Sequence, residues 1–322
     1  MEIHNHQALE YKDIVLKHKK SILTSRSEAD ITAELGNHAF ACPVVAANMR
    51  SILTPEIIEI FDSRNWFYVY PRSYDPAEIA RFVAYANNDL NVVSISIGVT
   101  TEWLALLKAI KLYGYRVDYF TVDVSLSWND NILPVVEYIK TNFPKSFLIV
   151  GNGAEPDWVE WLESYGVDAA KVGLANGSVC STYNATGIRS TLGSLIDCVS
   201  AAKNIQIIAD GGFRIDDRTG IINSGDFNKA IRFGADMCMS GSAWSRCVDS
   251  PAITDTYYGN ASEVAKQSKK HVEGVGVEVQ SNGMTISETM DYIEDSFRSS
   301  ISFFGGNDMS SLKTADFIDM RH

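Results

Sequence analysis

The chain has no long apolar segment and no excess of positive charge. No stretch of its 322 residues reaches the roughly 18 consecutive apolar residues of a membrane span, and the start, MEIHNHQALEYKD, lacks the apolar core of a signal peptide. The formal net charge of -12 argues against a nucleic acid or an anionic membrane as the main partner. We therefore expect a cytoplasmic protein with a small-molecule partner, since loops and helix N-termini can hold a phosphate even in an acidic protein.

Cysteine is scarce and irregularly placed. The five residues are an odd number without metal-like spacing, which predicts reduced thiols and no metal site. They are Cys42, Cys180, Cys198, Cys238 and Cys247. Internal repeats, low-complexity tracts and Pro-rich linkers are also lacking, so we expect one domain over residues 1–322.

What the chain does contain is a regular alternation of two kinds of segment. Short apolar runs typical of strands buried on both faces cover residues 43–49, 66–70, 92–98, 117–124, 146–153, 169–174, 205–212 and 236–242. Segments with helical spacing cover residues 55–64, 75–87, 101–114, 131–143, 155–166, 191–204 and 224–234. Eight strands alternating with seven helices predict an α/β protein, a (β/α)₈ TIM barrel, with a doubly wound open sheet as the alternative.

A barrel would place the site at the carboxyl ends of its strands, where such folds carry their chemistry. The residues at these ends are Asn48, the 70–72 turn, Gly98, Asp123, residues 151–153, the loop with Cys180, residues 210–212 and residues 241–242. We expect them to converge on one face of the molecule.

Glycines gather after the last two predicted strands, in the motifs ADGGF and MSGS. Gly211, Gly212, Gly241 and Ser242 would let backbone N–H groups approach a phosphate where barrels commonly bind one. Asp210 could accept hydrogen bonds from two ribose hydroxyls. A nucleotide and a flavin mononucleotide both suit this pattern, and glycines that serve only tight turns are the alternative.

Cys180 has an unusual setting for a structural cysteine, because GSVCST surrounds it with small polar residues after an apolar run. A thiolate is a strong nucleophile, and Ser178 with the loop N–H groups could stabilise it. Thr182 could pass a proton to or from a bound group if a carboxylate oriented it. A loop cysteine without a role is the alternative, and the other cysteines lie in strand or helix contexts that suit packing.

The stretch KVGLANGSVCSTYNATG resembles the catalytic loop of the IMP dehydrogenase/GMP reductase family, whose pattern is KVGIGPGS[IV]CTTR. LEYKDIVLKHKKSILTSRSEADI is similar to the family's N-terminal segment and PVVAANM to its first strand. ADGGF, GAD and MSGS are similar to its phosphate-binding end, and EDSFRSSISFFGG to its closing helix. The resemblance follows the whole chain in order and implies a barrel with an N-terminal extension, a flap and a closing helix near the C-terminus.

The resemblance favours the reductase branch of the family. The regulatory insert that dehydrogenases usually carry after the second strand is lacking, and the flap candidate SKKHVEGVGVEVQSNG has no adjacent Arg and Tyr to activate water. Reductases have a glutamate there, which aligns with Glu273 and is implied to orient Thr182.

The implied activity is the NADPH-dependent reductive deamination of a purine nucleotide, GMP to IMP and ammonia, through a covalent thioether of Cys180. The resemblance implies proton transfer through Thr182 and Glu273, substrate contacts from Ser178, Asp210, Gly211, Gly212, Met239, Gly241 and Ser242, and NADPH contacts from Asp123, Gly98 and Asn48. It also implies a homotetramer.

Several residues depart from the family pattern near the expected ligand. Arg72 takes the place of a lysine that assists catalysis, and it keeps the charge but cannot donate a proton at ordinary pH. Ala175 and Asn176 replace the Gly and Pro of a turn that helps bind potassium, so we expect no monovalent cation site. Further departures are Arg50-Ser51, Ser125-Leu126, Tyr183 and a longer loop over residues 214–226.

These departures leave four alternatives to GMP reduction. The chain could oxidise IMP, act on a modified purine nucleotide, use flavin mononucleotide as its cofactor, or bind a purine nucleotide without turnover.

Overall fold

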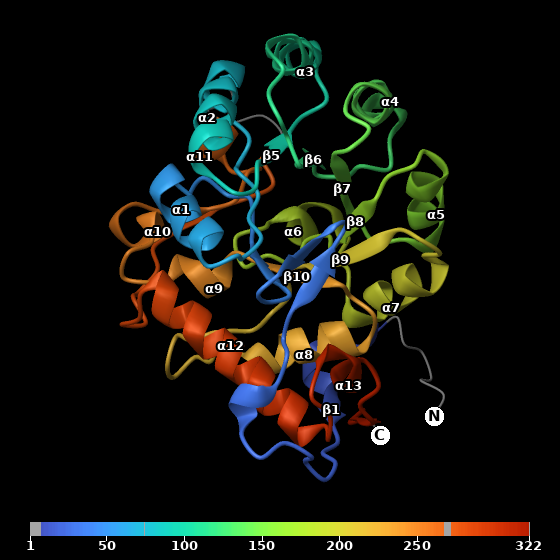
Figure 1. Ribbon diagram of the computed structural model, residues 1–322, viewed down its shortest axis with the longest axis vertical. Coiled ribbons are helices and arrows are strands. Elements are labelled where there is room, and N and C mark those ends of the chain that lie inside the picture. Colours follow the sequence, from blue (N-terminus) through green and yellow to red (C-terminus); the bar gives the residue numbers. More distant parts are fainter. Residues whose placement is uncertain (1–7, 74, 267–271, 322) are drawn as a thin grey trace.

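The computed structural model describes residues 8–73, 75–266 and 272–321, and its centre is a curled sheet of seven parallel strands (Figure 1). The strands are β4 (Val44–Ala46), β5 (Ser94–Ile97), β6 (Tyr119–Asp123), β7 (Phe147–Gly153), β8 (Ala169–Val172), β9 (Gln206–Asp210) and β10 (Met237–Ser240). Their order is β4-β10-β9-β8-β7-β6-β5, so β10 pairs back onto the first strand of the alternation. The chain therefore has the predicted α/β, TIM-barrel-like fold.

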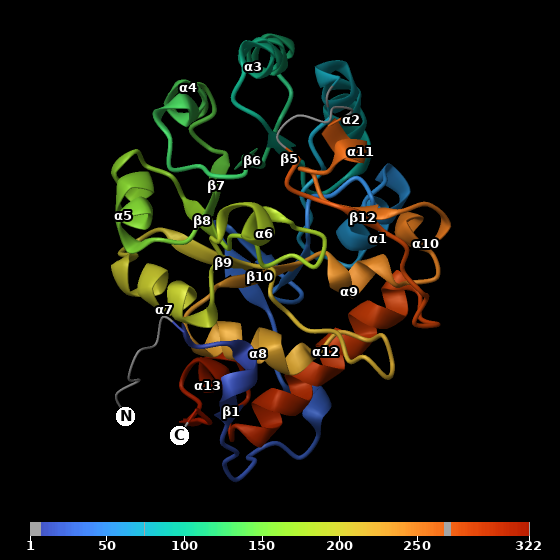
Figure 2. The same cartoon turned by 180° about the vertical axis from the view of Figure 1, so that it is seen from behind.

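Each segment predicted to be helical forms a helix, and these helices surround the sheet (Figures 1 and 2). They are α1 (Pro55–Ser63), α2 (Pro76–Asp89), α3 (Thr101–Tyr113), α4 (Leu133–Asn142), α5 (Pro156–Ser164), α7 (Leu192–Ala201) and α8 (Ser224–Arg232). Their starts follow from capping: the Thr54 side chain accepts from the Ile57 N–H, and the Asp75 side chain accepts from the Ala77 N–H. Gly114 ends α3 with a φ of 72°, a conformation that favours glycine.

Residues 66–70 differ from the prediction of a full strand. Tyr70 makes a single parallel bridge to Ile95 of β5, and Pro71 directly follows it. Trp66, Phe67 and Tyr68 are all buried. The segment therefore occupies the expected place beside β5 mainly through side-chain packing, because proline has no N–H to extend the ladder.

The N-terminal segment covers the amino ends of several strands. β2 (Ala33–Leu35) and β3 (His38–Phe40) form an antiparallel hairpin, and the Tyr119 hydroxyl at the start of β6 donates to the Leu35 carbonyl at 2.8 Å. The Gly36 N–H donates to Gln206 Oε1 at the start of β9, also at 2.8 Å. This hairpin closes the end of the sheet opposite the predicted site.

The C-terminal region contains the predicted closing helix, which begins earlier than the sequence indicated. α12 (Ile286–Phe303) packs against α8 and against α9 (Ser242–Ser245). β1 (Ile14–Leu16) pairs antiparallel with β13 (Phe317–Asp319), which joins the two ends of the described chain. No helix within the described ranges combines the length and the apolar character needed to cross a bilayer.

The flap predicted over residues 268–283 is described only from residue 272, since residues 268–271 lie outside the described ranges. There β12 (Gly276–Val277) pairs with β11 (Tyr257–Tyr258). The remaining short elements are η2 (Tyr11–Asp13), η3 (Arg26–Glu28), η4 (Asp130–Ile132), α6 (Thr182–Thr186), α10 (Pro251–Thr254), α11 (Glu263–Lys266) and α13 (Met309–Lys313).

Trp244 on α9 anchors the region behind the site. Its ring is fully buried and makes edge-on contacts with Phe61 at 5.0 Å and Trp66 at 5.8 Å between centroids. We expect Trp244→Ala to lower the free energy of unfolding by about 3–5 kcal/mol, measured by urea denaturation, because it empties a large buried volume. Trp128→Ala is the control: that ring is 44% exposed, and its loss should change stability by no more than about 0.5 kcal/mol. Equal losses in both variants would contradict this account.

Candidate active site

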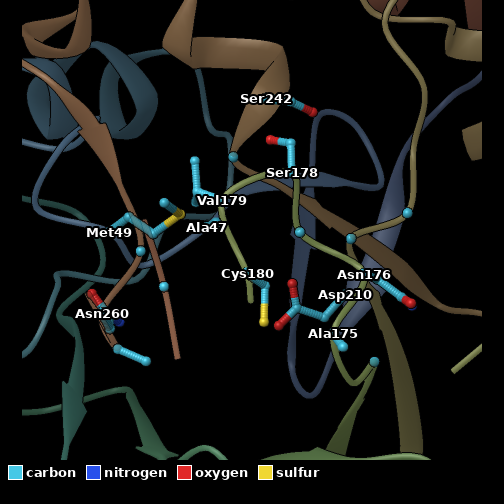
Figure 3. Close-up of a pocket in the computed structure, with 18 of the residues that line it drawn as sticks. Ala47, Met49, Ala175, Asn176, Ser178, Val179, Cys180, Asp210, Ser242 and Asn260 are labelled. Atoms are coloured by element: carbon cyan, nitrogen blue, oxygen red, sulfur yellow. The ribbon is translucent and has the colours of Figure 1, made fainter. Parts of the chain in front are cut away.

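A cavity of about 870 Å³ lies at the carboxyl ends of the strands. Its lining includes the predicted residues Asn48, Arg72, Asp123, Ser178, Cys180, Thr182, Asp210, Gly211, Gly212, Gly241, Ser242 and Glu273. Figure 3 shows Cys180 in the middle of this lining, with Ser178 and Ser242 above it, Met49 and Asn260 to its left, and Asp210 and Asn176 to its right. The volume is in the range of small-molecule sites, so the cavity is the candidate binding site.

Cys180, Thr182 and Glu273 form a chain of hydrogen bonds in this cavity. Cys180 Sγ donates to Thr182 Oγ1 at 3.2 Å, and Thr182 Oγ1 donates to Glu273 Oε2 at 3.0 Å. A hydroxyl between a thiol and a carboxylate can pass a proton toward the carboxylate as a thiolate forms, and can return it afterwards. The geometry therefore suits a nucleophilic cysteine coupled to a proton store.

Backbone pairing brings Glu273 to this place from a distant part of the chain. Cys180 and Gly274 form an antiparallel bridge, the Ser181 N–H donates to the Glu273 carbonyl at 2.9 Å, and the Val275 N–H donates to the Val179 carbonyl at 2.9 Å. The loop with the cysteine and the start of the flap are thus held together by main-chain bonds, which fixes the side chains of Thr182 and Glu273 relative to each other.

Cys180 differs from the other cysteines in its exposure. It is half-buried, whereas Cys42, Cys198, Cys238 and Cys247 are buried. Burial raises the pKa of Cys198 to about 12 and that of Cys247 to about 12, and it raises the pKa of Cys42 and of Cys238 well above the usual value. Those thiols stay protonated and unreactive, so Cys180 is the candidate nucleophile.

Lys171 of β8 is the centre of a buried network of charges beneath the cavity. Its ammonium donates to Asp123 Oδ1 at 3.1 Å, to Asp210 Oδ2 at 3.2 Å and to Asn48 Oδ1 at 3.3 Å. Burial alone would lower the pKa of Lys171, but the two carboxylates outweigh it and raise the pKa. The lysine therefore stays charged and connects the ends of β6 and β9.

Arg72 approaches Asp123 from the turn after residues 66–70. Its Nε lies 3.3 Å from Asp123 Oδ2, within ion-pair distance but without the alignment of a hydrogen bond. Burial alone would raise the pKa of Asp123, yet the charges of Lys171 and Arg72 prevail and lower it to about 2. Asp123 is consequently an ionised acceptor at any ordinary pH.

Three residues of the site, Lys171, Asn260 and Tyr257, were missed from the sequence, whereas Asn152 belongs to the strand end predicted over residues 151–153. Asn152 of β7 donates to Asp210 Oδ2 at 2.8 Å, and Asn260 donates to Asp123 Oδ2 at 3.2 Å. Tyr257 of β11 is buried against Ser178, and burial raises its pKa to about 12. Lys171 alone had a signal in the sequence, because a lysine inside a run predicted to be buried needs a carboxylate partner. Nothing in the sequence pointed to Asn260 or Tyr257.

The glycine-rich end of the cavity has the backbone conformation expected from the sequence. Gly211 and Gly212 have φ values of 81° and 82°, which favour glycine. The Gly211 N–H donates to the Met239 carbonyl at 3.0 Å, so this amide takes part in the pairing with β10. A Cβ at Gly241 would lie 2.5 Å from the Tyr257 hydroxyl, which leaves room only for glycine there.

Two predicted residues lie outside the cavity lining. Gly98 is buried at the end of β5, where a Cβ would meet Trp103 Nε1 at 2.5 Å, so its lack of a side chain serves packing against α3. Met239 is fully buried in β10, with its sulfur 3.8 Å from the Lys171 ammonium.

The sequence predicts neither a metal site nor a monovalent cation site in this protein. In the part of the chain that the structure describes, no group of three or more His, Cys, Asp or Glu side chains is placed to hold a metal ion. Ala175 has a φ of 57°, a left-handed conformation that is strained for alanine and explains the glycine of the family pattern. The side chain of Asn176 lies 2.8 Å from Ser190 Oγ.

Comparison with known proteins agrees with the resemblance seen in the sequence. Residues 81–322 match the family model described as IMP dehydrogenase / GMP reductase domain. The chain is 35% identical over 327 residues to a GMP reductase of Helicobacter pylori (strain G27), with 98% of this chain and 97% of that protein covered. It is also 35% identical over 324 residues to GMP reductases of Staphylococcus aureus (strain MRSA252) and Oceanobacillus iheyensis, with 97% of this chain and 96% of each relative covered. The chain therefore belongs to the IMP dehydrogenase/GMP reductase family.

Proposed function

We propose that this protein is a GMP reductase-like oxidoreductase that converts GMP to IMP and ammonia with NADPH as reductant. The observation that carries the proposal is the hydrogen-bond chain from Cys180 Sγ through Thr182 Oγ1 to Glu273 Oε2, with distances of 3.2 Å and 3.0 Å. The names of the relatives, all GMP reductases, support the choice of reaction within the family.

The first step is attack of the Cys180 sulfur on C2 of the purine. The thiol proton passes to Thr182, whose own proton passes to Glu273, so the nucleophile is a thiolate. A bond forms between sulfur and C2, and the bond from C2 to the amino nitrogen then breaks. The proton stored on Glu273 returns through Thr182 to that nitrogen, which leaves as ammonia.

The second step removes the covalent bond to the enzyme. When bound, NADPH supplies a hydride to C2. The sulfur–C2 bond then breaks, the electron pair returns to Cys180 as a thiolate, and IMP is released. One cysteine thus serves both steps, and covalent catalysis divides one difficult displacement into two easier ones.

The two ends of the cavity suit the phosphate and ribose of GMP and the nicotinamide end of NADPH. Ser178, Gly212 and Ser242 are the proposed donors to the 5′-phosphate, with Gly241 allowing close approach, and Asp210 is the proposed acceptor for the ribose hydroxyls. For NADPH, the fitting feature is the ionised Asp123 beside Arg72, whose Nε is buried without a hydrogen-bond partner among the described residues. These two residues and Asn48 would hold the nicotinamide end.

Cys180→Ala tests the nucleophile. We expect this variant to lose NADPH oxidation with GMP, followed at 340 nm, while it still binds GMP in isothermal titration calorimetry. Cys198→Ala is the control, because that thiol is buried in α7 away from the cavity and should retain activity. Retained NADPH oxidation in Cys180→Ala would show the mechanism to be wrong.

Glu273→Gln tests the proton store. A glutamine keeps the shape of the side chain but cannot take the proton, so we expect kcat to fall by about 10²- to 10⁴-fold with little change in GMP affinity. Glu278→Gln is the matched control, since Glu278 lies in the same flap segment and also lines the cavity, but the hydrogen bond from Thr182 goes to Glu273. A similar loss in both variants would argue for a general effect of flap charge.

Ser242→Ala tests the phosphate end. Loss of one hydrogen bond to a charged group should weaken GMP binding by about tenfold or more, measured by calorimetry. Guanosine is the control ligand, because it lacks the phosphate and its affinity should not change. An equal loss for both ligands would place Ser242 elsewhere than at the phosphate.

A further inference from the structure

Arg50 lies outside the cavity and is connected to the turn that carries Arg72. Arg50 Nη1 donates to Ser73 Oγ at 2.8 Å and lies 3.0 Å from Glu78 Oε2, and Ser73 Oγ donates to Glu78 Oε2 at 2.6 Å. Arg50 follows β4, Ser73 follows residues 66–70, and Glu78 is in the first turn of α2. We call Arg50, Ser73 and Glu78 the loop clamp.

The loop clamp fixes the backbone on both sides of Arg72. Ser73, the residue directly after it, is buried and has its hydroxyl fully engaged. Before it, the Tyr70 hydroxyl donates to Glu78 Oε1 at 3.3 Å, and the Tyr70 ring stacks on Phe82 of α2 at 3.7 Å. The turn is thereby tied to α2 at two points.

The carboxylate of Glu78 is ionised in this arrangement. Burial alone would raise its pKa, but hydrogen bonds from Ser73 and Arg50 outweigh the burial and lower the pKa. The ion pair is accessible to solvent, with 41% of the Arg50 side chain and 31% of the Glu78 side chain exposed, so solvent screening weakens it; Ser73, which is 5% exposed, is the buried member of the clamp.

The guanidinium of Arg72 has one charged neighbour among the described residues. Its only ion-pair contact among the described residues is with Asp123. Its Nε is buried, the side chain as a whole is 25% exposed, and the residue lines the cavity. An arginine cannot give up its proton at ordinary pH, so it acts by the position of its charge and of its N–H groups.

We propose that Arg50 and Glu78 are positioning residues, which hold Arg72 against Asp123 and open to the cavity by fixing Ser73. Arg50 and Arg72, which both depart from the family pattern, then act together, because Arg50 holds the turn that carries Arg72. Without the clamp the turn is free to move, and Asp123 keeps Lys171 as its cation while Arg72 leaves. The inference concerns the placement of Arg72 and does not depend on the reaction, although its kinetic readout rests on the proposed function.

A double-mutant cycle tests the proposal with Arg50→Met, Arg72→Met and the double variant. If Arg50 acts through Arg72, the two effects on the urea unfolding equilibrium are non-additive. The change in the unfolding equilibrium constant caused by Arg50→Met should then be smaller, by about threefold or more, in the Arg72→Met background than in the natural protein. In NADPH oxidation we expect Arg50→Met to raise the KM for NADPH by about three- to thirty-fold with a smaller change in kcat, and to have no further effect on KM when Arg72 is already methionine.

Further variants separate positioning from general stability. Arg50→Lys keeps a cation beside Glu78, so its KM for NADPH should lie between those of the natural protein and Arg50→Met. Glu78→Gln should raise the KM for NADPH, as Arg50→Met does. Arg81→Met is the matched control, because it removes an exposed cation from α2, the helix that carries Glu78. The Arg81 guanidinium pairs with the Asp75 carboxylate, whereas it is the Asp75 N–H that reaches Ser73 Oγ, at 3.2 Å. Glu78→Gln with Arg72→Met forms the replacement cycle if Arg50→Met does not fold.

Additive effects in both backgrounds, on unfolding as well as on KM, would overturn the proposal and leave Arg50 a purely structural residue. A natural protein without NADPH oxidation on GMP would overturn the proposed function instead. In that case the unfolding cycle, which needs no ligand, still decides whether the clamp acts on Arg72.

Discussion

The buried ammonium of Lys171 imposes the constraint on which the site is built. The residue is 2% exposed, and removing a charge from water costs several kcal/mol unless partners surround it. Asp123 and Asp210 supply these partners from the ends of β6 and β9, on either side of β8 and β7. The same contacts keep Asp123 ionised and orient both carboxylates before a ligand arrives, which prepares them to accept hydrogen bonds from ribose hydroxyls or amide groups.

The loop with Cys180 begins beside Asp210, one of the two aspartates that contact Lys171. Directly after β8, a Cβ at Gly173 would lie 2.1 Å from the Asp210 carbonyl oxygen, so only glycine lets the chain pass the end of β9 this closely. From there the loop turns back to pair with residues 273–275 of the flap. The position of the thiol relative to Glu273 therefore follows from main-chain pairing, and side-chain rotamers alone do not decide it.

The departures from the family pattern lie at the rim of the cavity and in its supports. Ala175 accepts backbone strain where the pattern has glycine, and Asn176 contacts Ser190. The longer loop over residues 214–226 is held by the Arg214–Asp226 ion pair at 2.7 Å and by the bridge of Ile215 with Ile222. The strands and the chain from Cys180 to Glu273 are compatible with all these changes, because the changes affect loops that the sheet carries without depending on them.

The sequence was informative where local chemistry and periodicity decide the outcome. Runs of β-branched residues and capped helical segments predicted the alternation, and the rule that barrels act at strand ends predicted a site containing Cys180, Asp210 and Ser242. It was wrong on residues 66–70 as a full strand, since side-chain packing and Pro71 replace most of the ladder there. Gly98, predicted to contact the cofactor, lies outside the cavity lining and close to Trp103.

By itself, then, the sequence determined the class of fold, the strand ends and the unusual setting of one cysteine, because these depend on neighbours along the chain. The tertiary structure decided which distant groups meet: Lys171 with two aspartates, and Arg50 with the turn of Arg72. It also gave the geometry of the Glu273–Thr182 pair, which the family resemblance had implied. The contacts of Lys171 and Arg50 join segments that are far apart in the chain, and no periodicity or motif encodes their spacing. Burial makes them obligatory, since a charge or a polar group removed from water must find its partner wherever the fold brings one.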